Sequence, residues 1–246
     1  MTREEKNTCI VGILGVTFPG SQDCIQKFRK LAESEAVLPP LVYHQLDFSM
    51  VKPALENEDW MAIEEFLLDG VKKLEMEQVS FVIIPANTVH VVLESLQNKS
   101  LVPIINMIDA AAEKAKDENL KKVAVLGTSW TIKYHLYKKP LESRSIAYAL
   151  PNDDEQKTIQ NAILNELVPN NHVSEQTIFE LTSIVERLSK DGCDGVILAC
   201  TELPIVLNEK NCVGIKVLDT NSILAIAAFE KAKQIENDIR FSKLII

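Results

Sequence analysis

One cysteine stands at a place in the sequence where a thiol can do chemistry. Cys200 ends the apolar run Gly195-Val-Ile-Leu-Ala199 and is followed by Thr201 and Glu202. This pattern is typical of a buried parallel strand that delivers a loop to a ligand site. Backbone N–H groups in such a loop can lower the pKa of a cysteine, which then serves as a base or a nucleophile. We therefore expect Cys200 to be catalytic rather than a buried structural cysteine.

A second stretch of the chain matches the Cys200 region but lacks the thiol. The apolar run that begins at Phe81 leads into Ala86, Asn87 and Thr88, so Ala86 takes the place of Cys200. Cys200 lies 114 residues after Ala86. In the same way, the run that ends at Gly127 lies 112 residues after the run that ends at Gly15. The agreement between the two offsets predicts an internal repeat of one structural unit.

Strand-like and helix-like patterns alternate along the whole sequence. Strands are expected at Cys9–Thr17, Leu41–Asp47, Phe81–Ile84, Leu101–Ile105, Val123–Gly127, Ser145–Ala149, Val196–Ala199 and Val213–Leu218. Apolar residues at helical spacing lie between them, and the helix after Glu155 is expected to stop at Pro169.

This alternation predicts an α/β fold with two similar, pseudo-symmetric parallel-sheet halves, as in a flavodoxin-like sandwich. Ligands of such sheets bind outside the carboxyl ends of the strands, so the site is expected in the cleft between the halves. The expected domains are residues 1–108 plus 222–246, and residues 109–221.

Small hydrogen-bonding residues follow the expected strands. They are Thr17, Ala86, Asn87, Thr88, Thr128, Ser129, Cys200, Thr201 and Glu202. Side chains of these types suit a small polar ligand that is held by hydroxyl, amide and backbone N–H groups. The alternative is that they only cap loops.

Composition excludes several other classes of protein. The net charge of −9 and the pI of about 5.1 argue against a nucleic-acid or anionic-membrane partner. No apolar run approaches the roughly 18 residues of a membrane span. The five cysteines form neither a metal-binding spacing nor a disulfide framework, which favours a reducing cytoplasm. Gly12 and Gly15 lack the rest of a dinucleotide fingerprint, so no nucleotide cofactor is expected.

The same residues resemble the aspartate/glutamate racemase family. Its pyridoxal-independent members carry Cys-Asn-Thr in the first half and Cys-Thr-Glu or Cys-Thr-His in the second, and the matching stretches here are Ala86-Asn87-Thr88 and Cys200-Thr201-Glu202. Supporting matches are Gly12-Ile-Leu-Gly15, Leu126-Gly-Thr-Ser-Trp-Thr131, Asp153-Asp-Glu-Gln156 and Leu218-Asp-Thr220. The resemblance implies an isomerase without cofactor or metal whose partner is a small acidic amino acid, with a homodimer as the assembly to test.

The mechanism that the resemblance implies is a two-base racemisation. One thiolate removes the α-proton, and the opposite thiol returns a proton to the other face. Asn87, Thr88, Thr128 and Thr201 would hold the α-carboxylate. Glu202 would orient the thiol or the amino group, whereas His90 is expected to be structural.

Ala86 departs from this mechanism because a methyl group can neither give nor take a proton. Three explanations fit: the first thiol was deliberately replaced, water or another side chain serves as second base, or Cys200 alone supports a different reaction. One alternative to a racemase is a one-thiol lyase or decarboxylase, since arylmalonate decarboxylases of the same superfamily resemble this chain in keeping only the second-half cysteine. The other alternative is a non-catalytic protein that binds a dicarboxylate.

The residues expected to bind the distal carboxylate of an acidic substrate also differ from the family. Gln45 and its neighbours stand where aspartate racemases often have an arginine, and Glu166 stands where a lysine is expected. Lys133 and Lys138 could compensate, although a solvated surface is their expected place.

Overall fold

The computed structural model describes residues 8–35, 39–170 and 173–244. The chain divides into two compact units. Unit 1 contains Met1–Pro85, Val92–Ile105 and Leu224–Ile246, and unit 2 contains Ala86–Val91 and Asn106–Ile223. The short segment Ala86–Val91 is therefore packed into a different unit from the residues that flank it in sequence.

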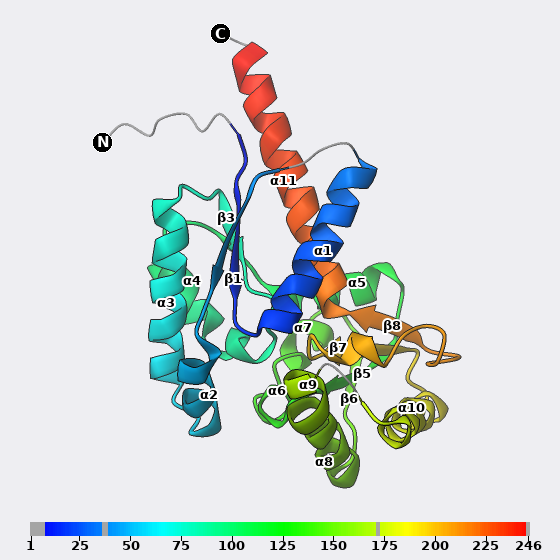
Figure 1. Cartoon of the computed structure of the whole chain (residues 1–246). Coiled ribbons are helices and arrows are strands. Elements are labelled where there is room, and N and C mark those ends of the chain that lie inside the picture. Colours follow the sequence, from blue (N-terminus) through cyan, green and yellow to red (C-terminus); the bar gives the residue numbers. More distant parts are fainter. Residues whose placement is uncertain (1–7, 36–38, 171–172, 245–246) are drawn as a thin grey trace. The chain divides into compact units, whose positions relative to one another are not determined.

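Unit 1 is built on a parallel sheet whose strands are separated by helices (Figure 1). Its elements in chain order are β1 (Val11–Gly15), α1 (Phe18–Ser34), β2 (Leu41–Gln45), α2 (Phe48–Glu56), α3 (Trp60–Met76), β3 (Phe81–Ile83), α4 (Leu93–Lys99), β4 (Ile104–Ile105) and α11 (Thr220–Leu244), which begins in unit 2.

Unit 2 repeats this plan with further short helices. Its elements are a 3-10 helix (Thr88–Val92), α5 (Met107–Asp117), β5 (Lys122–Gly127), α6 (Ser129–Lys133), α7 (Lys138–Glu142), β6 (Ala147–Ala149), α8 (Asp153–Asn161), a π-helix (Ala162–Leu167), α9 (Val168–Asn170), α10 (Glu175–Lys190), β7 (Gly195–Ala199), a 3-10 helix (Leu203–Ile205) and β8 (Lys216–Asp219).

The two sheets have the same strand order and confirm the predicted fold class. The order is β2-β1-β3-β4 in unit 1 and β6-β5-β7-β8 in unit 2, and every described pairing is parallel. The repeat extends to the register, because Gly12 pairs with Val82 and Ala124 pairs with Val196. These are the residues that the sequence offsets align. The domain boundaries and the cleft between the halves stay predictions.

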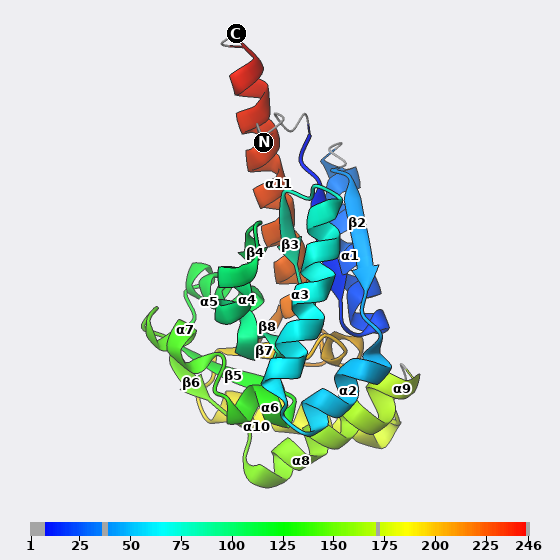
Figure 2. The same cartoon turned by 90° about the vertical axis from the view of Figure 1, so that its left-hand side faces the viewer.

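Each sheet is covered on both faces, which explains why its central strands are continuously apolar. In unit 1, α3 covers one face while α1 and α11 cover the other, where Phe28 and Phe229 meet edge to face at 5.9 Å (Figure 1). In unit 2, α8 and α10 lie on the opposite side of the strands from α5 and α7 (Figure 2). Leu126 and Leu198 face the first pair of helices, and Val125 and Ile197 face the second.

Prolines lie within the helical segments α9 and α2. The helical path that was predicted to stop at Pro169 has Asn170, one residue later, as the last residue of α9. Pro169 lacks the N–H of a regular turn, and its ring would collide with the carbonyl of the residue four positions earlier. The π-helix before it widens that turn and relieves both problems. Helix α2, which contains Pro53, was not predicted, and it begins where the Asp47 carboxylate accepts the Ser49 N–H.

No helix within residues 8–35, 39–170 and 173–244 combines the length and the apolar character that a membrane crossing requires.

Candidate active site

The site begins at the carboxyl ends of three neighbouring strands of unit 2. Gly127 of β5 pairs with Ala199 of β7, and Leu198 of β7 pairs with Asp219 of β8. A Cβ atom on Gly127 would lie 2.7 Å from the Ala199 carbonyl oxygen, so only glycine permits this approach. Thr128, Cys200 and Thr220 directly follow β5, β7 and β8, and they therefore emerge at one edge of the sheet.

The segment Ala86–Val91 lies across this edge. The Asn87 side-chain amide donates to the Thr220 hydroxyl at 3.2 Å, and the Thr88 hydroxyl lies 2.9 Å from the Thr128 hydroxyl. Because β7 runs between β5 and β8, two adjacent residues that contact Thr220 and Thr128 must span the end of β7. Asn87 and Thr88 are thus brought to the strand ends from which Cys200 emerges.

Asn87 is held in place by a buried chain of hydrogen bonds. The Tyr137 hydroxyl donates to Asn87 Oδ1 at 2.5 Å, and the Thr220 hydroxyl, which accepts from Asn87, donates to the Leu198 carbonyl oxygen at 2.9 Å. Asn87, Tyr137 and Thr220 are all buried. Burial raises the pKa of the Tyr137 hydroxyl well above its ordinary value, so this group stays protonated and remains a donor.

Three threonine hydroxyls meet beside this chain. Thr88, Thr128 and Thr131 lie at oxygen–oxygen distances of 2.9 and 3.2 Å, and Thr128 also caps α6 by accepting the Thr131 N–H at 3.4 Å. Each hydroxyl can donate one hydrogen bond and accept two. The cluster therefore has hydrogen-bonding capacity beyond its internal contacts.

Cys200 forms a buried pair with Glu202. The thiol lies 3.1 Å from Glu202 Oε2, and the Thr201 hydroxyl donates to the same oxygen at 2.8 Å. Glu202 is only 2% exposed, so its carboxylate is fixed beside the sulfur. A carboxylate in this place can accept the thiol proton.

The expected fall in the pKa of Cys200 is wrong for the thiol as it lies here. Burial raises the pKa well above its ordinary value, and the negative charge of Glu202 raises it further. The backbone N–H groups of Glu202 and Leu203 act in the predicted direction, but their effect is smaller. The sequence reading overestimated these N–H groups because it could not show how completely the thiol is removed from water.

His90 has two structural contacts. Its Nε2 accepts the Met107 N–H at 3.2 Å, so its proton is on Nδ1, which donates to the Ala86 carbonyl at 2.8 Å. Burial lowers its pKa to about 4. The ring is therefore neutral near pH 7 and connects the segment Ala86–Val91 to the first residue of α5.

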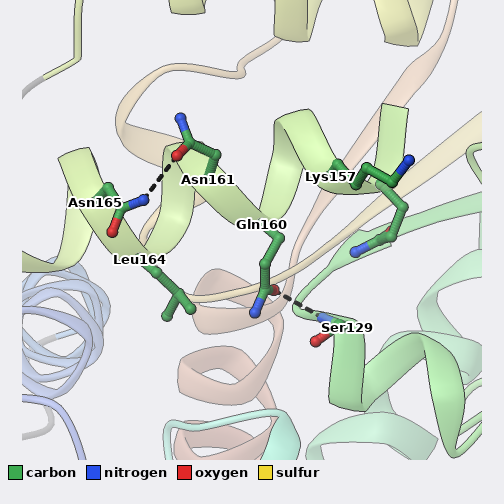
Figure 3. Close-up of a pocket in the computed structure, with 7 residues that line it drawn as sticks. Ser129, Lys157, Gln160, Asn161, Leu164 and Asn165 are labelled. Carbon is green, nitrogen blue, oxygen red and sulfur yellow. Dashed lines mark hydrogen bonds between the residues drawn. The ribbon is translucent and has the colours of Figure 1, made fainter. Parts of the chain in front are cut away.

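A pocket of about 330 Å³ lies beside the Thr128 loop (Figure 3). It is lined by Ser129, Gln156, Lys157, Gln160, Asn161, Leu164 and Asn165, and we call it the amide pocket. Gln156 donates to the Gly127 carbonyl at 2.9 Å, and Gln160 accepts the Ser129 N–H at 2.8 Å. Gln156 and Gln160 thus hold in place Gly127 and Ser129, the residues on either side of Thr128.

The remaining residues singled out from the sequence lie elsewhere. Thr17 is the N-cap residue of α1 in unit 1. Lys133 lies over the Tyr134 ring, and both Lys133 and Lys138 are exposed. Glu166 contacts the Ser174 N–H and the Thr177 hydroxyl at the start of α10.

Sequence reasoning missed three residues of the site. Thr131 and Thr220 belong to motifs that supported the family resemblance, so the signal for them was present. Tyr137 lies between α6 and α7, two short helices that were not predicted, and no pattern distinguished it from other buried aromatic residues.

Comparison with known proteins places this arrangement in a family. A relative, the broad specificity amino-acid racemase RacX of Bacillus subtilis (strain 168), is 28% identical over 184 residues, which cover 74% of this chain and 78% of RacX. An aspartate racemase homologue from Pyrococcus horikoshii OT3 has a similar structure, with a TM-score of 0.77 and 28% identity over 91% of this chain and 98% of that chain.

The aspartate racemase of Picrophilus torridus shares the fold, with a TM-score of 0.73 at 24% identity over 92% of this chain and 94% of that chain. A sequence model of the family described as Asp/Glu/hydantoin racemase matches residues 13–228. The resemblance inferred from the two motifs is confirmed, and the chain belongs to the Asp/Glu/hydantoin racemase family.

Proposed function

We propose that this protein transfers a proton at the α-carbon of an amino acid without a cofactor, with Cys200 as the acid/base. The observation that carries the proposal is the hydrogen bond between the Cys200 thiol and the Glu202 carboxylate at the end of β7. Racemase relatives that act on small amino acids support the same chemistry.

The reaction begins with proton transfer from Cys200 to Glu202. The resulting thiolate takes the α-proton, and the electron pair of the C–H bond moves toward the α-carboxylate. Hydroxyl groups of Thr88 and Thr128 stabilise the charge that develops there, while Asn87 keeps Thr88 beside Thr128 and the Thr201 hydroxyl holds Glu202. Return of the proton from Cys200 restores the original enantiomer.

Inversion needs a proton on the opposite face, and Ala86 cannot supply it. In this chain that proton comes from water or from another side chain. We therefore expect exchange of the α-proton with solvent to be faster than racemisation. The resemblance implies aspartate or glutamate as substrate, and both belong in the test.

A second candidate follows from the same alanine. One thiol suffices for a lyase or decarboxylase, because only one face of the product is reprotonated after carbon dioxide leaves. Such an enzyme would place deuterium on one face of its product and would not exchange the α-proton of an amino acid. A non-catalytic protein would bind a dicarboxylate without any turnover.

Exchange in D₂O tests the proposal. L-Aspartate and L-glutamate are each incubated with the protein, and loss of the α-proton signal is followed by NMR, with Cys200→Ser as the control. Exchange that depends on Cys200 is the expected result. An unchanged α-proton signal with every amino acid, or equal exchange by Cys200→Ser, would refute the proposal.

A further inference from the structure

The amide pocket has an unusual lining for a family whose description names aspartate and glutamate. Its polar groups are mainly carboxamides, which carry no charge. Its cation, Lys157, forms an ion pair with Asp154 at 2.8 Å, and both side chains are largely exposed. The acidic residues next to the lining in sequence are also occupied, since Glu155 pairs with Arg187 and Glu166 contacts the start of α10. The pocket therefore provides no uncompensated charge for a carboxylate.

The hydrogen bonds already present leave a defined set of groups for a ligand. Asn165 uses its nitrogen on Asn161 Oδ1, so its own oxygen remains an acceptor. Gln160 uses its oxygen on the Ser129 N–H, so its NH₂ group remains a donor (Figure 3). One acceptor and one donor, both on uncharged side chains, match a group that can itself donate and accept.

The pocket is also apolar in part and locally irregular. Leu164 contributes an apolar wall and is 37% exposed. Leu164 and Asn165 belong to the π-helix Ala162–Leu167, and π-helical turns occur frequently at functional sites. A ligand with an apolar stem and a polar end suits these walls.

The position of the pocket relates it to the reacting thiol. Ser129 lies two residues after Gly127, whose strand partner Ala199 directly precedes Cys200. Because β5 and β7 are neighbouring strands, Ser129 and Cys200 both follow the same carboxyl edge of the sheet. The helix that lines the pocket packs on the face of the sheet that also buries Cys200.

We propose that the amide pocket receives the side chain of the substrate and selects an uncharged side chain that ends in a hydrogen-bonding group, such as the carboxamide of glutamine or asparagine. This inference rests on the proposed function for its place in a reaction, but it concerns binding. A volume of about 330 Å³ is sufficient for such a side chain and lies at the lower end of ordinary ligand pockets.

Binding of L-glutamine and L-glutamate by the full chain tests the inference. Affinities are measured by calorimetry, and the side-chain amide resonances of Gln160 and Asn161 are followed by ¹⁵N NMR. We expect glutamine to bind at least about tenfold more tightly than glutamate and to shift both resonances. Tighter binding of glutamate, or binding of neither amino acid, would overturn the inference.

Charge variants sharpen the test. Leu164→Arg places a cation at an exposed wall and should shift the preference toward glutamate, whereas the matched control Leu164→Met should leave it unchanged. If Leu164→Arg does not fold, Asn161→Asp places an anion at another exposed wall and should weaken glutamate binding further. A preference that neither charge changes would contradict a role of the pocket in binding.

Exchange at the α-carbon separates this inference from the proposed function. Preferential glutamine binding without any exchange would refute the proposed reaction and leave the pocket assignment intact. Exchange that is faster with glutamate and aspartate than with glutamine and asparagine would refute the pocket assignment and leave the reaction intact.

Discussion

The Cys200 thiol donates a hydrogen bond to Glu202 Oε2 across 3.1 Å, and both residues are buried at the end of β7. The carboxylate has two opposing effects. Burial raises the pKa of the thiol most, and the charge of Glu202 raises it further and helps to keep the sulfur protonated at rest, but Glu202 also provides the group that can accept the proton.

Glu202→Gln should separate these two effects. Removal of the negative charge lowers the pKa of Cys200, so the thiolate fraction near neutral pH rises. We expect the ultraviolet absorbance of the thiolate, measured as a difference from Cys200→Ser, to titrate at lower pH in the variant. Exchange of the α-proton should fall by about 10²–10⁴-fold, because general acid–base assistance is lost. A variant whose thiol titrates at the same or higher pH would contradict the assigned role of Glu202.

Tyr137→Phe should destabilise the protein. The change removes the buried donor to Asn87 Oδ1, and an unsatisfied buried acceptor costs about 1–3 kcal/mol. Urea unfolding measures the loss, and slower exchange at the α-carbon would accompany it because Asn87 and Thr88 span the end of β7. Tyr148→Phe is the matched control, since the Tyr148 hydroxyl is buried without a hydrogen-bond partner. Equal destabilisation by both changes would show that the chain through Asn87 is not important.

Stability should fall between pH 6.5 and pH 4 because of His90. Burial lowers its pKa from 6.5 to about 4, so in this range the unfolded chain binds a proton that the folded protein does not. The difference corresponds to about 3 kcal/mol at about 1.4 kcal/mol per pH unit. Below pH 4 this contribution is lost completely, and above pH 6.5 it is fully present.

NMR titration of the His90 ring gives its pKa directly. His90→Gln keeps a donor and an acceptor and should flatten the dependence of the free energy of unfolding on pH in this range. A measured pKa at or above 6.5 would show that the ring is more hydrated than its contacts to Ala86 and Met107 indicate.

Much of the fold could be predicted from the sequence, because a strand buried on both faces and an amphipathic helix have distinct patterns. The repeat was accurate to the level of register, as the pairing of Gly12 with Val82 and of Ala124 with Val196 confirms. The predicted helix end at Pro169 lies one residue from Asn170, the last residue of α9, whereas the π-helix before it was not predicted, since local propensity does not record it. The assignment of Ala86–Val91 to unit 2 depends on contacts to Tyr137, Thr128 and Thr220, which are distant in sequence.

The candidate site, like the fold, could be predicted from the sequence only in part. Cys200 and Glu202 are two residues apart in sequence, so their proximity could be expected, whereas the sign of the pKa shift at Cys200 depends on burial that only the fold determines. Ser129 and Gln156 of the amide pocket lie in stretches that supported the family resemblance, but the pocket itself had no sequence signal, because glutamine and asparagine residues at helical spacing are typical of any solvated helix face.

The measurement that tests the central claim most directly is the rate of racemisation by Ala86→Cys, followed by chiral chromatography with aspartate, glutamate, asparagine and glutamine. If Cys200 is one base and residue 86 is the place of its partner, the variant should racemise at least one of these amino acids about 10²–10⁴-fold faster than the unaltered chain. Cys200→Ser in the same background should abolish the gain. A correctly folded Ala86→Cys protein with no gain for any of the four would contradict the claim.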